Sequence, residues 1–206
     1  SWSGLDHGGS WKSMHYMARR FYAPVLVTAR KCEDEFIISA VSDLVEVFAL
    51  SLEVVAVSLS ASKSIFYSGK VNLSPDAGQE ITRIKLNDIA RDQILFLNWT
   101  DEQGNAVRNH AAPVAYKHFN LPAPQLQTTA TVQGDTLNIS ISAKNIALYV
   151  SAECDVAGHF SDSAFDLLSG ETQTITFTAD HPSDIARAKD TLVIRDLYSS
   201  SHSTTH

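Results

Sequence analysis

The hydrophobic positions of the chain repeat at helical spacing in one place, near its beginning. Five apolar side chains recur three or four residues apart and predict one stripe of an amphipathic helix over 10–22: Trp11, Met14, Met17, Ala18 and Phe21. Ser10 suits the N-cap of this helix, and Pro24 ends it at about Tyr22. A lone helix cannot bury such a stripe, so we expect it to pack on a preceding part of a larger protein.

From Val25 onward the period changes to two, which is typical of strands with one buried face. The alternation slips near Val55, where a β-bulge would account for the change of phase. A polar segment over 100–105 predicts a hairpin connection. We expect strands at 25–29, 35–41, 48–59, 63–68, 79–86, 93–99 and 107–119, with a helical turn at 87–91. This pattern predicts an antiparallel sandwich of Ig-like size over 23–121.

Two prolines, Pro122 and Pro124, mark a joint after this sandwich, because they fix an extended path and interrupt strand pairing. The alternation then restarts, and we expect further strands at 125–133, 137–143, 147–154, 174–178 and 192–197. They predict a second, smaller sandwich over 122–206 whose polar tail frays from Ser199. The predicted fold class is mainly β, with two Ig-like antiparallel β-sandwich domains preceded by one amphipathic α-helix.

Composition and charge exclude several classes of partner. The formal net charge of −7 argues against nucleic acid, which requires a basic patch. The most apolar run, 44–59, is interrupted by Glu46 and Glu53, so we expect no membrane-spanning helix. Cys32 and Cys154 fall in different predicted sandwiches without a C-x-x-C motif and are interpreted as small buried hydrophobes. The cellular compartment stays open.

Candidate chemistry is sparse. The acidic residues 33–35 are adjacent, so they cannot all point to one side of a strand and indicate a solvated turn instead of a metal site. The eight histidines show no H-E-x-x-H arrangement, and His7 is the one best placed for a role. No strand–elbow–helix setting for a nucleophilic serine is present. We therefore predict no catalytic residue, no metal site and no cofactor.

Two segments resemble the β-mannosidases of glycoside hydrolase family 2. The first reads S-W-S-G-L-D over 1–6 and G-G-S-W-K over 8–12, and it continues with His15, Tyr16, Phe21, Ala23 and Pro24. The second, F-S-D-S-A-F-D-L-L-S-G-E over 160–171, resembles a stretch of the last domain of these enzymes and of related glucosaminidases. Ser163 and Ser169 stand where that family usually has Asn and Pro, at turn positions where serine is tolerated.

The resemblance implies that residues 1–22 are the last loop and helix of a catalytic (β/α)8 barrel, followed by the two sandwiches. It also implies two catalytic glutamates on earlier barrel strands, about 5–5.5 Å apart as a retaining mechanism requires, and no Glu precedes the predicted helix. The chain is then non-catalytic and supports the barrel of the same polypeptide, which hydrolyses terminal β-D-mannosyl residues. Trp2 is the one implied substrate-binding residue, near a sugar subsite of the intact barrel.

Three alternatives stay open at this stage. The chain could be a tandem Ig-like module that binds carbohydrate or protein through an exposed aromatic platform. Trp99, at a strand end beside a hairpin, is the candidate for that platform, although a position in the sandwich core is the favoured interpretation of this residue. It could also be the same region of a family 2 glucosaminidase or galactosidase. Without a barrel, the apolar stripe would fold back on the first sandwich or pair with the same helix of a second molecule, which predicts a dimer.

Overall fold

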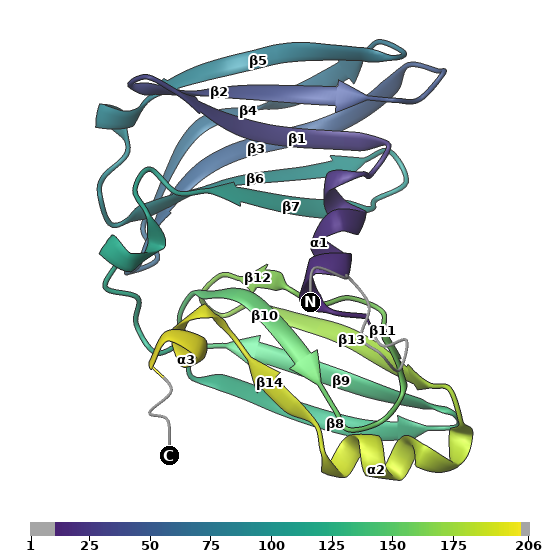
Figure 1. Ribbon diagram of the computed structural model, residues 1–206. Helices are drawn as coiled ribbons and strands as arrows, with labels where there is room; N and C mark the ends of the chain where they lie inside the picture. Colours follow the sequence, from purple (N-terminus) through teal and green to yellow (C-terminus); the bar gives the residue numbers. More distant parts are fainter. Residues whose placement is uncertain (1–10, 203–206) are drawn as a thin grey trace. The chain divides into compact units, whose positions relative to one another are not determined.

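The computed structural model describes residues 11–202 and divides the chain into two compact units (Figure 1). One unit is Phe21–Asn120, which contains the first sandwich. The other unit combines Leu121–His206, which contains the second sandwich, with the N-terminal segment that ends at Arg20. Helix α1 (Ser13–Phe21) therefore packs on the second sandwich. The helix is present as predicted. Without a barrel, sequence analysis expected it to contact the first sandwich or the same helix of a second molecule; the first of these is wrong, and the second stays a prediction.

The first sandwich has two antiparallel sheets. Strands β1 (Val25–Cys32), β2 (Glu35–Ser42) and β5 (Ala77–Lys85) form one sheet in the order β1-β2-β5. Strands β4 (Lys63–Leu73), β3 (Phe48–Ser58), β6 (Gln93–Asp101) and β7 (Ala106–Ala111) form the other in the order β4-β3-β6-β7. Alternate residues of both sheets meet in one core, among them Ile38, Leu52 and Leu97.

A register shift lies at the place that the sequence indicated, but its structural origin differs. The pairing of β3 with β4 shifts between Val54 and Val55, and the additional residue belongs to β4. Strand β3 itself keeps its alternation, because both Val54 and Ala56 lie in the core. The apolar Val55 on the other face is also buried, so the apparent phase slip reflects burial of both faces of β3.

The strand expected over 107–119 is shorter than predicted. Strand β7 ends at Ala111, and a 3-10 turn, η2 (Tyr116–His118), follows. Pro113 has no N–H to continue the ladder, which explains the stop. The helical turn expected near 87–91 is present as η1 (Leu86–Asp88).

The second sandwich also has a three-stranded and a four-stranded antiparallel sheet. Strands β11 (Gly158–Phe160), β13 (Thr172–Ala179), β9 (Thr136–Ala143) and β8 (Leu126–Gln133) follow one another in the order β11-β13-β9-β8. Strands β12 (Phe165–Leu167), β10 (Ala147–Glu153) and β14 (Val193–Arg195) form the smaller sheet. The inward residues, such as Ile139, Ile175 and Phe177, form the core. The predicted fold class of two Ig-like sandwiches is confirmed.

Short helices near the C-terminus were missed by the sequence analysis. They are η3 (Pro182–Asp184), α2 (Ile185–Asp190) and α3 (Leu197–His202). Helix α3 continues through 199–202, where fraying was expected. Asp196 caps the helix: its Oδ1 accepts the N–H of Tyr198 at 2.8 Å and of Ser199 at 3.2 Å. The Ser199 hydroxyl in turn accepts the N–H of Asp196, which completes a reciprocal cap.

Cys32 and Cys154 are both free thiols, each partly buried. Across residues 11–202, no group of three His, Cys, Asp or Glu side chains is arranged to hold a metal ion. No helix in the same range is long and apolar enough to cross a membrane.

Limited proteolysis should expose the two-unit architecture. Trypsin is expected to cut first after Lys117, which is exposed in the η2 turn ahead of the proline-containing joint. Because α1 belongs to the first fragment but packs on the second sandwich, the two fragments should migrate together in gel filtration and separate only in denaturant. Fragments that separate under native conditions would contradict the packing of α1.

Candidate functional site

The residues that sequence analysis singled out do not form a catalytic site in the described part of the chain. Trp2 and His7 lie outside the described residues. Trp99 is only 5% exposed and packs in the core of the first sandwich, so it provides no aromatic platform for a sugar. Of the acidic residues 33–35, Glu33 and Asp34 form the predicted turn between β1 and β2, whereas Glu35 begins β2 and pairs with Arg83 at 2.6 Å.

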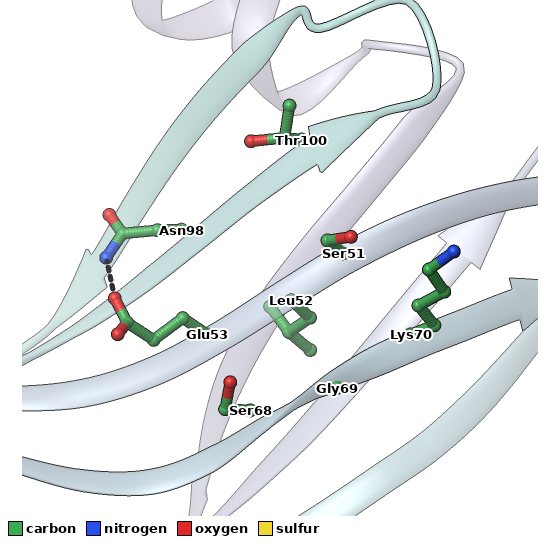
Figure 2. Close-up of a pocket in the computed structure, with 8 residues that line it drawn as sticks. All are labelled: Ser51, Leu52, Glu53, Ser68, Gly69, Lys70, Asn98 and Thr100. Atoms are coloured by element: carbon green, nitrogen blue, oxygen red, sulfur yellow. Dashed lines mark hydrogen bonds between the residues drawn. The ribbon is translucent and has the colours of Figure 1, made fainter.

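A shallow depression of about 400 Å³ lies on the sheet formed by β4, β3 and β6 (Figure 2). Its polar side chains come from Ser51, Glu53, Ser68, Lys70, Asn98 and Thr100. Glu53 is the one carboxylate of this lining, and its Oε2 accepts a hydrogen bond from Asn98 at 3.3 Å. Hydrolysis of a glycosidic bond usually requires a pair of carboxylates, so this depression lacks the groups for that reaction.

A more specific arrangement joins helix α1 to the edge of the second sandwich. Strand β11 is the edge strand of its sheet, and its residue Phe160 pairs with Phe177 of β13. The N–H of Phe160 donates to the Tyr16 hydroxyl oxygen at 3.0 Å, and that hydroxyl donates to the Phe160 carbonyl at 3.1 Å. Tyr16 therefore satisfies both outward backbone groups that a further strand would otherwise bind. We call this contact, together with the ion pairs of Arg19 and Arg20 described below, the helix anchor.

Apolar packing supports the hydrogen bonds of Tyr16. The Tyr16 side chain is 1% exposed and belongs to the core cluster of the second sandwich. The Trp11 ring lies 5.5 Å from the Tyr16 ring and 5.6 Å from the His159 ring, measured between centroids. On the inner side, the rings of Phe160 and Phe177 lie 4.7 Å apart. The anchor is thus continuous with the core.

Two arginines of the last helical turn add charge-assisted contacts. Arg20 reaches Asp162 Oδ1 at 2.6 Å and the Ala164 carbonyl at 3.2 Å. Arg19 donates to the Ser161 carbonyl at 3.0 Å and lies 3.4 Å from the same carboxylate oxygen. The Arg20–Asp162 pair is half-buried, so water screens it less than a surface pair.

The anchor brings together the two segments that carried the family resemblance, and sequence analysis did not predict this contact. Tyr16 lies outside the predicted stripe, two of whose members, Met14 and Phe21, are 55% and 53% exposed. The stretch beginning at Phe160 was interpreted only as packing and turn. One signal was available, because Tyr16, Arg19 and Arg20 share a helix face by their spacing.

Burial raises the pKa of the Tyr16 phenol, because the phenolate would be desolvated, although the hydrogen bond from Phe160 acts in the opposite direction. The folded state therefore holds this proton more tightly than the unfolded chain, whose tyrosines titrate near pH 10. The stabilising effect is complete below that pH and is lost as the pH rises through the folded pKa. We expect the second sandwich to lose stability above pH ~10 less steeply in Tyr16→Phe than in the unchanged chain. Urea denaturation between about pH 8 and about pH 11 measures this change. Identical slopes of unfolding free energy against pH in both proteins would contradict it.

Comparison with known proteins finds similarity to mannosidases. Residues 121–200 match the Ig_mannosidase family of Ig-fold domains. The chain is 26% identical over 201 residues to beta-mannosidase A of Aspergillus oryzae, and 26% identical over 190 residues to the beta-mannosidase of Capra hircus. Each alignment covers 86% of this chain, which spans about 22% of the length of these relatives.

Solved structures show the same fold. The β-D-mannosidase of Dictyoglomus thermophilum matches 96% of this chain and 24% of its own, with a TM-score of 0.78 at 15% identity. An exo-chitosanase of Amycolatopsis orientalis matches 95% of this chain and 28% of its own, with a TM-score of 0.66 at 16% identity. Residues 121–200 thus form a mannosidase-type Ig-fold domain, and the chain as a whole is similar to the C-terminal region of glycoside hydrolase family 2 β-mannosidases, which confirms the resemblance found in its two sequence segments.

Proposed function

We propose that this chain is the non-catalytic C-terminal support of a longer, retaining β-mannosidase-like exo-glycosidase that hydrolyses terminal β-D-mannosyl residues. Residues 1–22 are then the end of the catalytic barrel, and the barrel of the same polypeptide is the principal partner. The relatives support this choice of substrate, because they are named as β-mannosidases. A role in the corresponding region of a glucosaminidase has weaker support, since the exo-chitosanase shares the fold at 16% identity.

The helix anchor is the observation that carries this proposal. Tyr16 and the two arginines hold the last helix ahead of the sandwiches in one orientation on the second sandwich. Whatever precedes the helix is therefore joined to the sandwich by a rigid element as well as by the polypeptide backbone. A catalytic barrel attached in this way would have a fixed C-terminal helix, which is the support that the proposal requires.

The exposed part of the predicted stripe suits the same partner. Met14 and Phe21 are more than half exposed, and each would bury apolar surface if the barrel covered the helix. Met14 and Phe21 lie seven residues apart and so share one helix face, and apolar side chains that gather on one exposed face can mark a contact surface. Pairing with the same helix of a second molecule is the alternative way to cover these side chains.

The binding-module alternative loses its main candidate residue. Stacking of a sugar on an aromatic face needs an exposed ring, and Trp99 is buried. Trp11 packs against the core of the second sandwich. Of the tryptophans in the described residues, neither offers the platform on which that alternative depended.

Activity measurements test the proposal. The isolated chain should hydrolyse no aryl β-mannoside, because the general acid and the nucleophile that supply most of the rate are expected upstream of Ser1. The coding sequence upstream of Ser1 should encode a barrel with two strand-end glutamates, and the longer product should be active. Turnover by purified residues 1–206 above a buffer blank would contradict the proposal, as would an upstream sequence without such a barrel.

A further inference from the structure

The outward face of the sheet β11-β13-β9-β8 has an unusual chemistry. On β8, β9 and β13, every second residue points away from the core, because the residues between them face the core, where Ile139 and Ile175 are buried and only those towards the sheet edge and strand ends, such as Thr128, are exposed. The strand register places these outward residues in four rows of three. The rows are Gln127–Ser142–Thr172, Thr129–Ser140–Thr174, Thr131–Asn138–Thr176 and Gln133–Thr136–Thr178. We call this set the hydroxyl face.

The hydroxyl face carries no charged residue at any of its twelve positions. Charged residues make up 19% of the chain, so about two would be expected among twelve positions at random, and more on a surface. Large apolar side chains are absent from these positions as well. The face is therefore uncharged and polar throughout, unlike the depression on the first sandwich, where Glu53 and Lys70 both contribute.

Hydrogen-bonding groups on this face remain available. The side chains of Thr129, Thr131 and Thr174 are exposed, and within the described residues no protein group hydrogen-bonds to their hydroxyls. Asn138 and Gln133 do bind one another, at 2.7 Å. The open hydroxyls can each donate and accept, so the face offers both kinds of hydrogen bond to a ligand.

The spacing and rigidity of the face favour an extended ligand. Neighbouring strands lie about 4.8 Å apart, and outward residues of one strand repeat at about 6.8 Å, so the hydroxyls form a regular two-dimensional array. Seven of the twelve residues are threonines, whose branched Cβ restricts χ1. Ordering such side chains on binding costs less conformational entropy than ordering long flexible ones.

We propose that the hydroxyl face binds an uncharged, extended polysaccharide chain laid across the strands. A neutral glycan presents regularly spaced hydroxyls. When it binds, the hydroxyl face and the glycan replace hydrogen bonds to water with hydrogen bonds to each other, and no ion has to be desolvated. Nucleic acids and anionic lipids find no lysine or arginine here with which to pair. The choice of β-mannan as the first probe rests on the proposed function, whereas binding of a neutral glycan by this face does not.

The test is depletion of the full chain from solution by insoluble β-mannan and, separately, by cellulose, at low and high salt. We expect retention on β-mannan that salt leaves unchanged, since no ion pairs form. The double variant Thr129→Glu/Thr174→Glu places two charges in one row of the face and should weaken retention at least ~tenfold, because a carboxylate must then be desolvated.

The matched control is Thr128→Glu/Gln173→Glu, which adds the same charges to exposed neighbours on the same two strands but on the opposite side. It should bind as the unchanged chain does, and circular dichroism must show both variants folded. Binding to cellulose but not to β-mannan would support the hydroxyl face and count against the mannoside substrate of the proposed function. No retention on either polymer, or equal losses in both double variants, would overturn the inference.

Discussion

Replacing Tyr16 with alanine should lower the free energy of unfolding of the second sandwich by about 4–6 kcal/mol. Truncating a buried aromatic side chain to alanine costs about 3–5 kcal/mol through lost burial and the cavity that remains. The N–H and carbonyl of Phe160 also lose their partner, and each group left unsatisfied costs about 1–3 kcal/mol unless water enters. Since a domain is stable by about 5–15 kcal/mol, this change would leave the second sandwich marginally folded.

Native-state hydrogen exchange of the β9 and β13 amides can measure this loss separately from the first sandwich. Tyr16→Phe removes the hydroxyl alone and should cost about 1–3 kcal/mol. Tyr22→Ala is the matched control, because Tyr22 is 87% exposed, and it should change stability by less than about 0.5 kcal/mol. If Tyr16→Ala and Tyr22→Ala have similar effects, the helix anchor does not stabilise the sandwich.

Gly158→Ala should destabilise the second sandwich by about 3 kcal/mol or more. Gly158 opens the edge strand β11 with a φ of +154°, a conformation that side chains with a Cβ rarely adopt. A Cβ at this position would lie 2.3 Å from the Thr178 carbonyl oxygen and 2.9 Å from the Cα of Ala179. Both contacts are with backbone atoms of β13, so relief requires β11 to move away from its partner strand.

Gly134→Ala provides the control for backbone conformation alone. Gly134 also has a positive φ, +59°, but a Cβ there would meet no atom within 4 Å. Its replacement should cost about 1–2 kcal/mol, the usual penalty of the left-handed conformation. Thermal unfolding and hydrogen exchange of β11 and β13 compare the two variants. Equal losses would show that the close approach of Gly158 to β13 contributes nothing beyond its φ.

Sequence reasoning identified what depends on local pattern. Alternation of apolar and polar residues located strands such as β2, β3 and β9, because a period of two exposes one face of a strand whatever lies opposite. Pro24 and the prolines at 122 and 124 marked the boundaries of the helix and the two sandwiches, because proline restricts its own φ and the preceding residue in any context.

Elements with weak local pattern were missed or misjudged. Helices α2 and α3 have six residues each, too few to show a helical period, and their stability comes from context. Ile185 and Ala188 of α2 are buried in the core of the second sandwich, and α3 begins at the side-chain cap of Asp196. The six residues of each helix do not by themselves predict the core contact of α2 or the side-chain cap of α3.

The sequence by itself determined the fold class, the two sandwiches and the two segments that resemble β-mannosidases. Only the tertiary structure decided that these segments meet, with Tyr16 bonded to the backbone of Phe160 from 144 residues away. It also decided that twelve uncharged residues from three strands form one face. The physical reason is the same in both cases. A strand or helix shows in its own sequence which side is apolar, but the partner of an edge and the neighbours of a face are set by register and packing between segments far apart in the chain.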